Sequence, residues 1–176
     1  MPPRRNVRVD EQAEELREKL GITAIPVPVE RIARALGAQL RYSPLDNEIS
    51  GMIFIREGSP IIGVNSLHHP HRQRFTIAHE IGHLELHRDI ITANVHVDKS
   101  FPVLRRDENS AMGTNQIEVA ANQFAAALLV PRSIIDAEFK DKPHDIDDDG
   151  PLEALSKKLR ISKQTLEYRI RNLERA

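Results

Sequence analysis

The sequence of 176 residues contains no cysteine at all. This absence excludes disulfide bonds, thiolate metal sites and a cysteine nucleophile. If the protein binds a metal ion, histidine, aspartate or glutamate side chains must hold it. The composition, with 40% hydrophobic residues, is sufficient for one core and indicates one compact domain with a small appendage.

The sequence also lacks a dominant charge and a long apolar run. Lys and Arg number 25 and Asp and Glu number 26, so the net charge is −1 and no overall field attracts nucleic acid or a membrane. The longest apolar run, residues 124–131, is far too short to span a bilayer, and residues 1–6 lack the apolar stretch of a secretory signal. We therefore expect a cytoplasmic protein without a membrane partner.

Periodicity in the first half of the chain predicts two helices followed by a small sheet. Apolar residues recur at helical spacing before Gly21 and before Gly37, and glycine is a common helix stop. Residues 39–43, 50–56 and 60–65 have the character of short strands, and the last two form a hairpin. This hairpin offers either an edge strand that pairs with an extended substrate or a strand pair that only shields the core.

Two long helices are predicted after the sheet, one from Pro70 to His87 and one from Gln116 to Leu129, halted by Pro131. Together with the strands they predict an α+β fold in which a small mixed sheet packs on the first of these helices.

A charged, turn-rich segment in the last third of the sequence indicates that the whole chain has three parts. We assign residues 1–141 to the main domain, residues 142–150 to an acidic linker and residues 151–176 to a helical hairpin that resembles a helix-turn-helix.

The segment His79-Glu80-Ile81-Gly82-His83 has the HExxH pattern of a zinc site on a helix. Residues four apart on a helix lie about 40° from each other around the axis and roughly 6 Å along it, so both imidazoles can reach one ion. Zinc lowers the pKa of a bound water, and the adjacent carboxylate of Glu80 is placed to take its proton as general base. Gly82 weakens the helix without local need, which predicts close approach of another backbone.

A third ligand is expected from the second long helix. His87 continues the histidine series but would lie about 12 Å along the axis from His79, too far for one ion to bridge. Glu118 and Asn122 offer a carboxylate and an amide on one helical face, the amide as a hydrogen-bond partner of a liganding imidazole. The alternative is that Glu118 only caps the helix three residues after Asn115.

These segments resemble the ImmA/IrrE family of zinc metallopeptidases. The matching residues are 63–65, 72–87 and 118–131, and the similarity extends from about residue 27 to residue 175. The resemblance implies a minimal zincin domain of the gluzincin type, with one zinc ion held by His79, His83 and Glu118. It also implies an endopeptidase that cleaves a DNA-binding repressor, often a helix-turn-helix protein encoded nearby.

The rival interpretation is a DNA-binding transcriptional regulator in which the zinc site is structural or vestigial. Residues 151–176 carry an apolar seam, and their cations outnumber their carboxylates. A helical hairpin that packs on the peptidase or grips its substrate has the same pattern. The neutral overall charge favours that hairpin over DNA binding.

Overall fold

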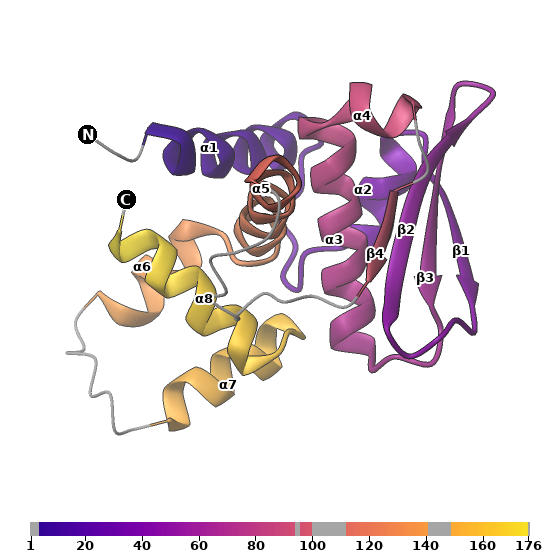
Figure 1. Cartoon of the computed structure of the whole chain (residues 1–176). Helices are drawn as coiled ribbons and strands as arrows, with labels where there is room; N and C mark the ends of the chain where they lie inside the picture. The colour runs from indigo at the N-terminus through magenta and orange to yellow at the C-terminus, as the bar shows by residue number, and fades with distance from the viewer. Residues whose placement is uncertain (1–3, 94–95, 100–111, 141–148, 176) are drawn as a thin grey trace.

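A computed structural model describes residues 4–93, 96–99, 112–140 and 149–175 of the chain. It has the α+β class expected from the sequence, with a small sheet at one side and helices at the other (Figure 1). Within the described residues no helix is long and apolar enough to cross a membrane.

The sheet consists of β1 (Gln39–Ser43), β2 (Ile49–Arg56), β3 (Ser59–Asn65) and β4 (His96–Lys99) in the order β1-β3-β2-β4. It is mixed, because β1 runs parallel to β3 whereas β2 is antiparallel to both β3 and β4. The predicted hairpin is confirmed as β2 and β3. Its suggested edge role was wrong, because β1 and β4 pair with its two outer sides and make both of its strands internal.

Helix α3 (Pro70–Leu86) is the middle layer of the molecule and carries the HExxH segment. Proline fits the first helical position, where its missing N–H needs no partner, and the His69 side chain accepts a hydrogen bond from the backbone N–H of His71. The helix contacts β2 and β3 on one side and α5 (Met112–Leu129) on the other (Figure 1). Because both sides are covered, every residue from Phe75 to Leu84 is buried.

Helix α5 begins at Met112, four residues before the start expected from the sequence. Gly113 and Asn115 are weak helix formers, so the local pattern indicated a loop where the helix already runs. From Ala120 onward α5 is buried on every side, between α3 and α1 (Arg4–Lys19). Helix α2 (Val29–Ala35) packs near the start of α3.

Three further elements were not predicted from the sequence: α4 (Arg88–Ala93), β4 and α6 (Arg132–Phe139). They are short, and β4 has only four residues, so periodicity gives them little signal. The acidic linker expected at residues 142–150 lies outside the described residues except for its last two, and Gly150 already begins α7.

The C-terminal helices α7 (Gly150–Leu159) and α8 (Lys163–Glu174) are joined by the three residues 160–162, and their apolar side chains belong to the same core as the rest of the chain. Helix α8 lies against α5. Its Arg169 is only 1% exposed, donates from Nε to the Val130 carbonyl at 3.1 Å, and forms an ion pair with Asp10 of α1. One of the cations counted toward DNA binding is therefore buried inside the molecule.

Candidate metal centre

The two histidines of the HExxH segment point to one place. His79 and His83 lie one turn apart on α3, and their Nε2 atoms are 3.0 Å from each other. Both side chains are almost fully buried. An i, i+4 pair on an unbroken helix produces this convergence without help from other elements.

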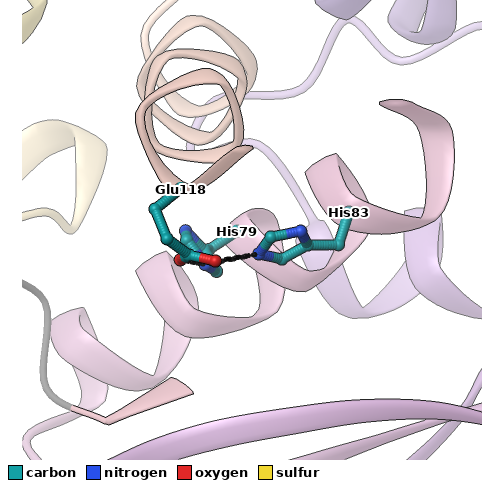
Figure 2. Close-up of side chains that lie close together, drawn as sticks. All are labelled: His79, His83 and Glu118. Carbon is teal, nitrogen blue, oxygen red and sulfur yellow. Dashed lines mark hydrogen bonds and ion pairs between the residues drawn. The ribbon is translucent and has the colours of Figure 1, made fainter. Parts of the chain in front are cut away.

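Helix α5 brings Glu118 to the same point (Figure 2). One carboxylate oxygen lies 3.2 Å from His79 Nε2 and the other lies 3.4 Å from His83 Nε2. Tetrahedral zinc with bonds of about 2.0–2.1 Å requires ligand atoms about 3.3 Å apart. The three side chains, which are a candidate metal group within the described residues, fit such an ion.

Glu118 also forms the open side of the cluster. Its side chain is 27% exposed, whereas the side chains of His79 and His83 are 0% and 1% exposed. Because α5 begins at Met112, Glu118 lies in the second turn, beyond the N–H groups that a first-turn cap would satisfy. The capping interpretation of this glutamate therefore loses its structural basis.

Gly82 explains how α5 comes so close to α3. A Cβ atom at this position would lie 3.2 Å from the backbone Cα and O atoms of Ala121 and 3.3 Å from Phe124 Cβ. Those backbone atoms cannot move without shifting the helix that carries Glu118. The close backbone approach predicted from Gly82 is confirmed.

Each histidine has a partner for its second ring nitrogen. His79 Nδ1 lies 2.8 Å from the amide oxygen of Asn122, which can only accept, so Nδ1 carries the proton and Nε2 keeps its lone pair for a metal. His83 Nδ1 lies 3.2 Å from His87 Nδ1. His87 was rejected as a ligand from its distance along the helix, and its contact with His83 was not predicted, although the i, i+4 spacing brings the two rings together.

Glu80 is completely buried on the side of α3 that faces β2. Gly51 of β2 makes room there, because a Cβ atom at this position would lie 2.3 Å from Thr76 Cγ2 and 3.3 Å from Glu80 Oε1. The need for glycine at this position of β2 arises only from the packing of β2 on α3, so no local pattern pointed to Gly51.

Comparison with known protein families identifies the family of this chain. A family model described as the IrrE N-terminal-like domain, a peptidase family, matches residues 33–171. The chain belongs to this family. A His-His-Glu cluster able to bind a metal ion accords with the metallopeptidase-like domain that membership indicates.

A solved structure of a Mycobacterium tuberculosis transcriptional regulator is similar to this member of the IrrE N-terminal-like family, with a TM-score of 0.60 and 17% sequence identity. The alignment covers 92% of this chain and 46% of the other, so this chain spans about half the length of that protein. At this identity the likeness concerns the fold alone. No curated protein matches the sequence.

Proposed function

We propose that the chain is a zinc-dependent endopeptidase whose catalytic centre consists of His79, His83, Glu118 and Glu80. The observation that carries the proposal is the convergence of three side chains of the HExxH helix and α5: His79 Nε2 and His83 Nε2 lie 3.0 Å apart, and one Glu118 oxygen lies 3.2 Å from the first and the other oxygen 3.4 Å from the second. Three protein ligands leave a tetrahedral ion one position for water or substrate, which is the pattern of catalytic and not of structural zinc.

Each residue has a distinct task in the proposed reaction. Bound zinc would supply Lewis-acid polarisation of the scissile carbonyl and a lower pKa for water. Glu80 takes the proton that the attacking water loses and later delivers it to the leaving amine. Asn122 holds the tautomer of His79 that leaves Nε2 free to bind the ion. The exposed side at Glu118 is where substrate would enter.

For the substrate we propose a DNA-binding repressor of the helix-turn-helix type encoded near this protein, and we expect few other substrates. Membership in the IrrE N-terminal-like family supports this proposal. A peptidase that cleaves a repressor would act in gene control. The structurally similar protein from Mycobacterium tuberculosis is named a transcriptional regulator, which accords with such a role.

Cleavage of such a repressor by the purified, zinc-loaded chain tests the proposal. Glu80→Gln keeps the size of the side chain but removes the base, so we expect it to retain zinc and its melting temperature while cleavage falls by about 10²–10⁴-fold. Glu85→Gln makes the same change at an exposed position five residues further along α3. This control variant is expected to cleave at the wild-type rate.

Unchanged cleavage by Glu80→Gln would reject the mechanism. The rival function, DNA binding with a structural zinc, predicts instead that the wild type cleaves nothing and that a short operator duplex binds to it. The burial of Arg169 argues against that function, because it removes a cation from the surface that would meet the phosphates.

A further inference from the structure

A concave site lies at the start of α3, before the turns that carry the metal cluster. It is a cavity of about 790 Å³ between the loop before α2, the first turns of α3 and the end of α7. Small-molecule sites are commonly about 300–1,000 Å³ in volume. The cavity is lined by Pro26, Pro28, Glu30, His69, Pro70, His71, Gln73, Arg74, Lys157 and Arg160.

Positive charge dominates this lining. Among its described residues, Arg74, Lys157 and Arg160 are permanent cations, and Glu30 is the one carboxylate. Two histidines, His69 and His71, add ring nitrogens to the lining. Glu153, 3.7 Å from Lys157 Nζ, and Glu30 offset part of this charge, and the repulsion that remains between the cations is relieved when an anion binds among them.

Arg74 is fixed in place by neutral groups. Its Nε donates to the Arg160 carbonyl at 3.2 Å, and one terminal nitrogen donates to the Val27 carbonyl at 2.9 Å. These carbonyl contacts orient the guanidinium and tie α3 to the end of α7 without cancelling its charge. Burial lowers the pKa of His71, and the neighbouring His69, Arg74 and Arg160 lower it further.

Arg160 occupies a backbone conformation that favours glycine. It ends α7 with φ 52° and ψ 51°, in the left-handed region where most helices of this ending place glycine. Arginine adopts this left-handed conformation at a higher steric cost than glycine does. Its side chain lines the cavity and is exposed to solvent, so it is available to a ligand.

We propose that this cavity binds a small ligand that carries two or more negative charges on phosphate groups, such as a diphosphate. Arginine pairs with phosphate oxygens through two parallel hydrogen bonds, and lysine adds a point charge. The ligand would bridge the start of the metal-bearing helix and the C-terminal pair. A concave site of this size suits a compact ligand better than the convex ridge of a DNA duplex. This proposal does not depend on the peptidase function.

Calorimetric titration of the full chain with inorganic pyrophosphate at constant ionic strength tests the proposal. We expect one site per chain. Arg160→Gly should weaken binding about ten-fold or more, because it removes charge-assisted hydrogen bonds, yet raise the melting temperature, because glycine fits the left-handed backbone. Lys157→Gln should weaken binding several-fold. The control Lys158→Gln alters the neighbouring exposed lysine, which does not line the cavity.

The opposite movements of affinity and stability in Arg160→Gly separate lost contacts from lost folding. Phosphate oxygens also bind metal ions, so pyrophosphate affinity unchanged in Arg160→Gly would assign the binding to the metal centre and overturn the proposal. Absence of binding to the wild type would overturn it as well. So would tighter binding of a short DNA duplex that Lys158→Gln weakens as much as Arg160→Gly, since that marks a general basic surface.

Discussion

The middle of α3 and its start are built for opposite charges. In the middle, two imidazoles and a carboxylate converge within 3.4 Å, and hydrogen bonds to Asn122 and His87 orient the rings. At the start, cations converge, and Arg74 is oriented by backbone carbonyls instead of carboxylates.

The two regions of α3 also differ in how tightly they are packed. Gly82 allows α5 to lie against the middle of α3 with backbone contact, and the ligand atoms of the two helices lie 3.0–3.4 Å apart, which is the spacing that one ion needs. The start of α3 and the end of α7 enclose a cavity. One helix thus combines a tightly packed cluster that suits a metal cation, open to solvent only at Glu118, with a hollow that suits an anion, and the two can be disturbed separately.

The largest expected effect is loss of the metal. His79→Ala and His83→Ala should each abolish stoichiometric zinc binding and the thermal stabilisation that zinc provides, because binding free energy adds to folding free energy. Pyrophosphate affinity should stay within about two-fold of the wild type, since a distant site retains its own contacts. Metal analysis and calorimetry on the same preparations check both expectations.

Arg160→Gly should give the reverse result, with zinc bound normally and pyrophosphate weakened. Full zinc stoichiometry in both histidine variants would refute the ligand assignment. Loss of pyrophosphate binding in those variants would show that the two regions are not separate.

A smaller effect is expected at Asn122. Asn122→Ala removes the acceptor that holds His79 in its metal-binding tautomer, and such partners typically contribute about 10–100-fold to metal affinity. Competition with a chromophoric chelator measures the change. Asn172→Ala, a half-buried asparagine on α8, is the matched control and should leave zinc affinity unaltered. Equal affinity in Asn122→Ala and the wild type would contradict the positioning role.

The smallest effect is expected at His87. His87→Ala removes the ring beside His83 Nδ1, but this position is only half-buried, so water can replace the lost partner. We expect zinc affinity to fall by about ten-fold or less, and His87→Gln to restore part of the loss by offering a new acceptor. A loss as large as that of His83→Ala would show that His87 is itself a ligand.

Local signals in the sequence predicted most of the elements that carry the site. Pro70 marks the start of α3, and Pro131 follows the end of α5. The periodic spacing of apolar residues indicated that both segments are helical. The order of the strands could not be predicted, because β1 and β4 join the hairpin through pairings between residues far apart in sequence. Four residues of β4 gave no pattern of their own.

In the candidate site, too, features set by local spacing could be predicted and contacts between elements could not. The pair His79 and His83 follows from spacing on one helix, and Glu118 followed from the face of a second helix together with the family resemblance. The burial of Arg169, one of the cations counted in residues 151–176, could not be predicted, because it depends on how α8 turns the side chain toward Asp10 and Val130. Contacts between elements, including the approach of Gly51 to Glu80, depend on packing that periodicity does not encode.

Zinc titration of Glu118→Ala, followed together with its melting curve, tests the central claim most directly. Glu118 is the one charged ligand and comes from the second helix, so its removal should weaken zinc binding sharply, and more than Asn122→Ala does. A glutamate that served the helix alone would cost about 1 kcal/mol of stability on removal and leave zinc binding intact. Zinc affinity in Glu118→Ala equal to that of the wild type would contradict the proposed metal centre.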